Sequence, residues 1–129
     1  IARRLVILAA EDVGLADPQG LTVAVSAQQA VHFIGMPEGL LPLSEATLYL
    51  SRAPKSNSAL TAYTSAAHDV RRTGNLPVPL HLRNATTSLT KLMGQGAGYR
   101  YPHESPDEAM TQQYLPDDLV GTRYYLADD

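Results

Sequence analysis

The longest uninterrupted apolar pattern in the chain runs from Asp17 to Gly35, and residues 18–37 contain no Lys, Arg, Asp or Glu. This pattern predicts a helix over 18–34, with Asp17 as its N-cap and Gly35 just beyond its end. A helix that is apolar on most sides is expected to be covered by other elements, with His32 as a hydrogen-bonded core residue. The segment is too short and too polar to span a bilayer. Its main stripe consists of Val23, Ala27, Ala30 and Ile34, and its other apolar residues are Leu21, Ala24, Val25, Val31 and Phe33.

Four further segments have apolar residues at helical spacing and end at Gly or Pro, which predicts helices over 2–13, 42–53, 57–73 and 86–93. In the 57–73 helix the apolar stripe consists of Leu60, Tyr63, Ala67 and Val70.

Prolines at positions 77 and 79 predict an extended arm over 75–84, because proline removes a backbone donor and disfavours helix before it. Residues 94–129 are predicted to be mostly irregular, apart from one helical turn around 107–112. This tail is rich in tyrosine, whose large ring is expected to pack on a surface. The predicted fold is therefore all-α: one five-helix domain over residues 1–129 with a long irregular arm.

Charge is distributed unevenly along the 129 residues, whose net charge is −3. Residues 1–51 sum to −3, residues 52–100 to +6 and residues 101–129 to −6. The basic middle could pair with the acidic tail, in this or a neighbouring subunit, or it could bind phosphate, or the charges could simply be solvated. The chain has no Cys, which excludes disulfides and thiolate metal sites.

No catalytic, cofactor-binding or metal-binding constellation is evident. The glycines at positions 94, 96 and 98 lack the Lys-Ser or Lys-Thr that follows a phosphate-binding loop. The four histidines lack the spacing of metal ligands, and no pair of carboxylates is predicted to converge. Candidate contacts to DNA or to another subunit are six cations and two tyrosines: Lys55, Arg71, Arg72, Arg83, Lys91 and Arg100, with Tyr99 and Tyr101.

Several longer strings make a family resemblance specific. They are Arg3-Arg4-Leu5, Glu11-Asp12-Val13-Gly14-Leu15-Ala16-Asp17-Pro18, Gly35-Met36-Pro37-Glu38-Gly39, Ala53-Pro54-Lys55-Ser56-Asn57, Pro77-Val78-Pro79-Leu80-His81-Leu82-Arg83-Asn84-Ala85, Gly98-Tyr99-Arg100-Tyr101 with His103, and Gln112-Gln113-Tyr114-Leu115-Pro116. In this order they resemble the C-terminal part of the RarA/MgsA replication-associated recombination ATPases. These AAA+ proteins are related to clamp-loader subunits and to the Werner-helicase-interacting protein.

The resemblance implies a helical domain like the clamp-loader collar, which holds the ATPases together as a homotetramer. It implies that ATP and Mg²⁺ bind to an ATPase module outside this chain, so the chain itself is expected to have no enzymatic activity and no cofactor. The start at Ile1 without Met likewise suggests a fragment of a longer protein.

For the longer protein, the resemblance implies a role in DNA replication, recombination and repair at stalled or gapped forks. Its expected partners are DNA and single-strand-binding protein, with no membrane, in the cytoplasm and associated with the nucleoid. The alternative for this chain is a DNA-binding module that uses the basic stretch 52–100.

Overall fold

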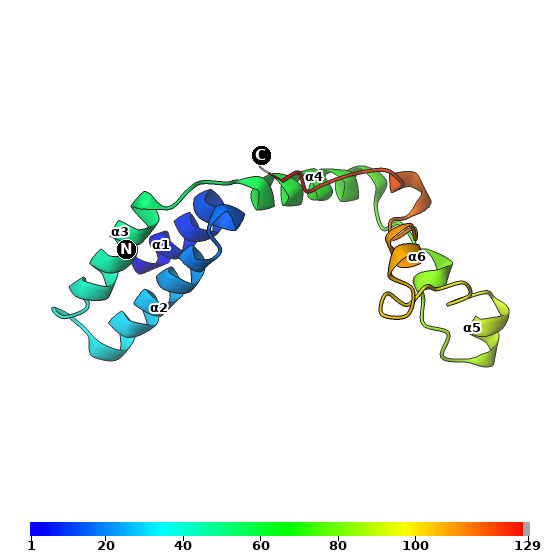
Figure 1. The fold of residues 1–129 in the computed structure, drawn as a ribbon, viewed down its shortest axis with the longest axis horizontal. Coiled ribbons are helices and arrows are strands. Elements are labelled where there is room, and N and C mark those ends of the chain that lie inside the picture. Colours follow the sequence, from blue (N-terminus) through cyan, green and yellow to red (C-terminus); the bar gives the residue numbers. More distant parts are fainter. Residues whose placement is uncertain (128–129) are drawn as a thin grey trace. The chain divides into compact units, whose positions relative to one another are not determined.

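The computed structural model describes residues 1–127, and these contain helices and loops but no strand (Figure 1). This confirms the predicted all-α class. The α-helices are α1 (Ala2–Leu8), α2 (Gln19–Ile34), α3 (Leu40–Arg52), α4 (Ser58–Thr73), α5 (Ser88–Leu92) and α6 (Pro106–Met110). A π-helical turn, η1 (Ala9–Val13), follows α1, and three short 3₁₀ turns complete the list: η2 (Gly14–Ala16), η3 (Leu80–Leu82) and η4 (Asp117–Leu119).

The predicted boundaries need small corrections. The segment 2–13 is helical throughout but changes type after Leu8, where the π-helical turn begins. The 42–53 helix begins two residues earlier, at Leu40, because a proline is tolerated in the first turn, where backbone N–H groups lack partners in any case. The predicted five helices become six, since α6 takes the place of the single turn expected around 107–112.

The α5 helix is shorter than the predicted 86–93 because a capping box fixes its start. The Thr90 backbone N–H donates to Thr87 Oγ1 at 3.2 Å, and the Thr87 N–H donates back to Thr90 Oγ1 at 3.0 Å. This reciprocal pair satisfies two donors at the first turn and places the N-cap at Thr87.

The chain divides into two compact units, one formed by residues 1–68 with 123–127, and the other by residues 69–122. The boundary falls inside α4, between His68 and Asp69. The sequence predicts one domain over 1–129, and this stays a prediction.

In the first unit α1, η1, α2 and α3 pack on one another around a small core (Figure 1). The core consists of Leu5, Ala9, Val13, Ala24, Ala27, Ala46 and Leu50. Gly20 is buried among them, and a Cβ there would lie 3.2 Å from both Val13 Cγ1 and Leu50 Cδ2. Small residues therefore bring the helices close together, and few large side chains lie between them.

The prediction that α2 is covered on all sides is wrong for this chain alone. Its buried residues are Gly20, Ala24 and Ala27, which lie on one face. Leu21 and Phe33 are exposed, and His32 is exposed rather than buried in the core. The chain leaves much of the apolar surface of this helix uncovered.

Asp17 joins the start of α2 to the last turns of α3. Its Oδ1 accepts a hydrogen bond from the Gln19 backbone N–H at 3.1 Å, as a helix-start carboxylate is expected to do. Its Oδ2 accepts a second bond from the Tyr49 hydroxyl at 2.7 Å. This hydrogen bond is the main cause that raises the pKa of Tyr49, with smaller contributions from lost hydration and from the negative charge of Asp17.

The connection from α3 to α4 is tied to the end of η1. The Ser56 N–H donates to the Asp12 carbonyl at 2.8 Å, and the buried Ser56 and Ser58 hydroxyls lie 2.8 Å apart. Gly14 has φ +50°, and a Cβ on it would lie 2.6 Å from the Ser56 carbonyl oxygen. Only glycine allows this close approach, which fixes where α4 begins.

Hydrogen bonds join segments of the second unit that are distant in the sequence or lie next to α6. His81 Nε2 and the Gln113 carbonyl oxygen are 2.7 Å apart, and the Gly96 N–H donates to the Leu80 carbonyl at 2.9 Å. The Tyr114 hydroxyl donates to the Ala109 carbonyl at 3.0 Å. Among its described apolar residues, Ala109 alone is fully buried.

We predict that Gly14→Ala destabilises the chain more than Gly35→Ala does. Both glycines have positive φ, so each substitution costs about 1–2 kcal/mol for the backbone conformation. At Gly35 nothing lies within 4 Å of the added Cβ, whereas at Gly14 the Ser56 backbone must move. Denaturant unfolding should give Gly14→Ala a free energy of unfolding at least ~1 kcal/mol below that of Gly35→Ala. Equal losses would show that the Ser56 contact does not constrain the fold.

We also predict that the stability contributed by the Tyr49 hydroxyl depends on pH. Because the folded pKa of Tyr49 lies above its unfolded value of 10.0, this contribution is complete below pH ~10 and is lost as pH rises through the folded pKa. Tyr49→Phe should therefore unfold at lower denaturant concentration than wild type at pH 8, and the difference should shrink above pH ~10. Tyr125→Phe, at a half-exposed tyrosine of the first unit, is the control. A Tyr49→Phe difference that stays constant to pH 11 would contradict the assignment.

Candidate interaction surfaces

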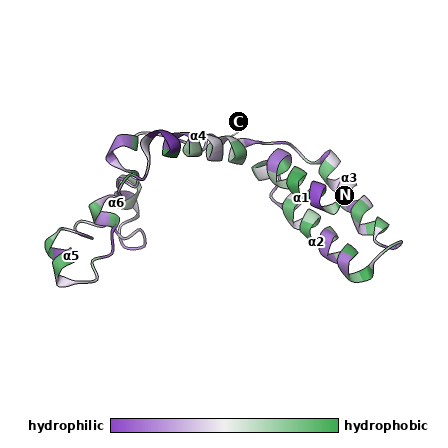
Figure 2. Ribbon diagram, turned by 180° about the vertical axis from the view of Figure 1, so that it is seen from behind, coloured by the Kyte–Doolittle hydropathy of each residue, from purple (hydrophilic) through white to green (hydrophobic). Residues whose placement is uncertain are grey.

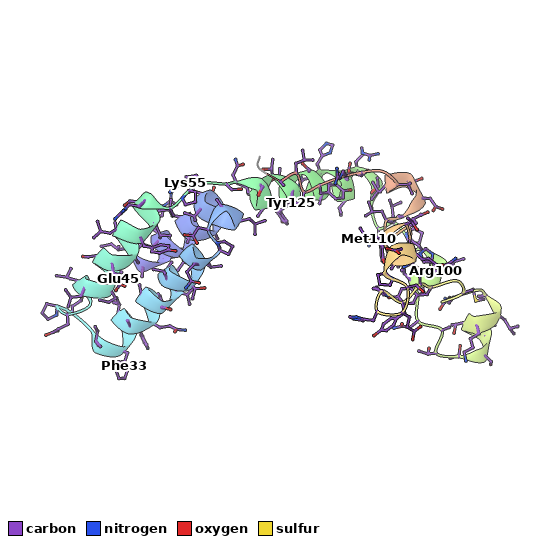
Figure 3. All side chains as sticks on the ribbon, viewed as in Figure 1. Phe33, Glu45, Lys55, Arg100, Met110 and Tyr125 are labelled. Carbon is purple, nitrogen blue, oxygen red and sulfur yellow. The ribbon has the colours of Figure 1, made fainter. Side chains whose placement is uncertain are left out.

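The end of α2 and the start of α3 expose large apolar side chains. Phe33 is 90% exposed and Leu41 74%, and Met36 lies in the turn between the helices with 62% exposure. Figure 3 shows Phe33 projecting away from the end of α2. Figure 2 shows hydrophobic positions along both of these helices. Contiguous exposed apolar surface of this kind is typical of interaction sites.

A shallow groove of about 240 Å³ runs between α2 and α3. It is called the α2/α3 groove here. Its less exposed lining includes the small side chains of Ala27 and Ala30 from α2 and Ala46 from α3, which form its floor, and it is also lined by Gln19, Thr22, Val23, Ser26 and Pro42. Glu45 lines the same groove and is its only charged lining residue. Small residues on facing helices allow another helix to approach closely.

The α4 helix presents an apolar stripe with spacing 3-4-3, formed by Leu60, Tyr63, Ala67 and Val70 and called the α4 seam here. Tyr63 is 72% exposed, Val70 57% and Leu60 43%. A stripe with this spacing is as narrow as the seam of a coiled coil. The seam therefore exposes large apolar side chains along α4.

The predicted cations are mostly engaged within the chain. Lys55 Nζ donates to the Leu50 carbonyl at 2.9 Å and to the Ala53 carbonyl at 2.6 Å, so it caps the C-terminal end of α3. Arg72 pairs with Asp69 at 2.9 Å on one helical turn of α4.

In the second unit, Arg83 Nε donates to the Val78 carbonyl at 2.6 Å, and Arg100 forms an ion pair with Glu108. Arg71 and Lys91 are exposed. Lys55 belongs to the first unit and the other five predicted cations to the second, so the structure does not assemble the six into one described patch.

The second unit does bring some predicted residues together. A cavity of about 390 Å³, called the unit-2 cavity here, is lined by His81, Arg83, Asn84, Tyr99 and Tyr114 among others. Tyr101 instead lies edge-on to His103, with ring centroids 5.3 Å apart. His81, Asn84 and Tyr114 were not predicted as site residues. These three residues lie in the strings 77–85 and 112–116, which support the family resemblance. That resemblance was the signal in the sequence that could have pointed to them.

Among residues 1–127, no group of three or more His, Asp or Glu side chains is placed to hold a metal ion. In the same range, no helix has the length and apolarity needed to cross a membrane.

Comparison with known proteins gives consistent matches over the whole chain. The family model for the C terminal of the MgsA AAA+ ATPase matches residues 1–129. The chain is 49% identical over 125 residues to an uncharacterized AAA domain-containing protein of Mycobacterium tuberculosis, covering 97% of this chain and 28% of that protein.

It is 44% identical over 127 residues to the replication-associated recombination protein A of Coxiella burnetii, covering 98% of this chain and 29% of the relative. It is 42% identical over 126 residues to the ATPase WRNIP1 of Dictyostelium discoideum, and the match covers 97% of this chain and 14% of that protein. The chain thus spans less than a third of the length of these relatives.

Proposed function

Because this chain belongs to the family of MgsA AAA+ ATPase C-terminal domains, we propose that it is the oligomerisation domain of an AAA+ ATPase. The proposed assembly is a homotetramer, and the proposed process is DNA replication, recombination and repair. The observation that carries the proposal is the apolar surface of the first unit, whose largest side chains lie outside its core.

The core of the first unit buries few large side chains, and several larger ones remain in water. The buried core includes Leu5, Val13 and Leu50 as its larger members, with alanines filling the rest. Phe33 and Leu41 remain largely exposed. Burying a side chain of this size contributes about 1.5–3 kcal/mol, so covering such residues with another subunit would stabilise an assembly.

Association of these domains would bring together the ATPase modules proposed to lie outside this chain. In the proposed longer chain, ATP and Mg²⁺ bind to a module outside these residues, and holding several such modules together raises their effective concentration. An ATP site in one module could then meet an arginine supplied in trans by a neighbour. DNA and single-strand-binding protein are the partners proposed for that longer protein.

We expect the chain to be a tetramer in solution. Size-exclusion chromatography with light scattering should give about four times the 13.9 kDa chain mass. High salt should leave the mass unchanged, because apolar burial is screened far less than surface ion pairs. A strict monomer at micromolar concentration would count against the proposal.

A second candidate function is binding of single-stranded DNA at the unit-2 cavity. Tyrosine rings can stack on bases, and an arginine beside them can contact phosphate. Tyr99, Tyr114 and Arg83 line this one cavity, which favours the candidate. Engagement of Arg83 with the Val78 carbonyl and of Arg100 with Glu108 counts against it, because both cations already have partners.

If this cavity binds DNA, Tyr99→Ala should weaken binding of a labelled oligothymidine by about 5- to 100-fold, because one stacked base contributes about 1–3 kcal/mol. Arg83→Ala should also reduce the slope of log affinity against log salt by about 0.7. The control is Tyr125→Ala, at a half-exposed tyrosine in the first unit. Fluorescence anisotropy measures both quantities, and no detectable binding at low salt would dispose of this candidate.

A further inference from the structure

Two unpartnered surfaces on the chain have matching dimensions. The α2/α3 groove is lined on α2 from Gln19 to Ala30, a rise of about 16 Å along the helix. The α4 seam runs from Leu60 to Val70, a rise of about 15 Å. One surface is a recess with a small-residue floor, and the other is a helix edge with projecting side chains.

We propose that the α4 seam of one copy docks into the α2/α3 groove of a second copy. This inference rests on the oligomerisation proposed above and specifies its geometry. The seam would place Tyr63, its largest and most exposed member, over the small floor at Ala27 and Ala30. Ridges of one helix pack into the groove between others in this way throughout helical proteins.

Charge favours the same pairing. Glu45 is the charged residue that lines the groove, and Arg71 directly follows the last member of the seam. Arg71 is exposed, whereas the neighbouring Arg72 already pairs with Asp69. Docking therefore brings opposite charges together at the edge of an apolar contact, where they add specificity more than affinity.

The groove cannot be filled by the α4 helix of the same chain. Residues 53–57 are held to the end of η1 by the bond from the Ser56 N–H to the Asp12 carbonyl. The close approach of Gly14 to the Ser56 carbonyl oxygen restrains the same connection. The first turns of α4 consequently start at that end and lead away from the packed α1, α2 and α3 helices (Figure 1). A second copy has no such restraint.

A contact between two different surfaces is head-to-tail. Each copy offers one groove and one seam, so contacts continue from copy to copy until the rotation closes a ring. A symmetric contact, in which the same patch meets itself, would stop at a dimer. Head-to-tail docking is therefore compatible with the proposed tetramer without a second kind of interface.

The first experiment uses one variant for each surface and measures mass by light scattering. Ala30→Arg fills the groove with a long charged side chain, and Tyr63→Glu removes the main projecting side chain and would place a carboxylate against the apolar floor. Each variant alone should fall from about four chain masses to one. The controls, Gln28→Arg on α2 and Ser65→Glu on α4, lie at exposed positions two residues from the altered sites, and both should remain tetrameric.

Mixing the two variants gives the decisive result. Ala30→Arg chains keep an intact seam and Tyr63→Glu chains keep an intact groove, so an equimolar mixture should form a heterodimer of two chain masses and stop there. If wild type is tetrameric but either variant stays tetrameric, or the mixture stays monomeric, this docking is wrong while oligomerisation stands. If wild type is monomeric, the proposed function fails as well.

A second measurement, cysteine cross-linking, tests the same contact even if the charged variants misfold. The chain has no cysteine, so single cysteines report on chosen pairs alone. Chains with Ala30→Cys and chains with Tyr63→Cys, exchanged and mildly oxidised, should form a disulfide-linked dimer only when both are present. A dimer from Tyr63→Cys alone would show instead that two α4 helices pair with each other, which overturns the proposal.

Discussion

Close packing of α1, α2 and α3 through small residues is the constraint on which the first unit depends. Gly20 allows Val13 and Leu50 to contact the same stretch of α2. Alanines at positions 24, 27 and 46 keep the helices near one another. The same choice leaves little volume inside the unit for large side chains, so Phe33 and Leu41 lie outside. A helix bundle built in this way is stabilised further when something covers its surface.

Electrostatics in the described chain are mostly local rather than arranged for a large anionic partner. Lys55 stabilises the end of α3 by bonding to carbonyl groups that the helix leaves without partners. Arg100 pairs with Glu108, so the basic stretch 52–100 and the acidic tail do meet at this point. The interpretation that the basic stretch pairs with the acidic tail of the same chain thus holds at this one ion pair. The pair leaves fewer cations available to bind phosphate.

The sequence predicted the bounds of α2, α3 and α4 to within two residues, because strong periodicity and clear end signals agree there, but it did not predict the change from α to π helix after Leu8. It could not predict what covers them. Glycine is unfavourable inside a helix by intrinsic propensity, yet the missing side chain of Gly20 is what lets Val13 and Leu50 pack against α2. His32 lies in an apolar run and was expected in the core, but it falls on the uncovered side. Periodicity identifies an apolar helix without saying whether its own chain or another one buries it.

The candidate sites were predicted less well, for a related physical reason. Six cations were grouped because they share a stretch of sequence, whereas their roles depend on nearby carbonyl and carboxylate groups that spacing does not show. The unit-2 cavity instead combines residues 81–85 with residues 96–114, brought together by the contact of His81 with the Gln113 carbonyl.

The connection from α3 to α4 restricts where α4 begins relative to α1, α2 and α3, and the proposed docking depends on that restriction. If residues 53–57 were free, α4 could fold back and cover its own groove, which would leave a monomer. The Gly14 approach and the Ser56 bond to Asp12 hold that connection in place, so both the groove and the seam stay open. A local constraint on one glycine thereby separates two complementary surfaces that belong to the same chain. In the proposed docking these two surfaces meet between chains, and a contact between two different surfaces is head-to-tail.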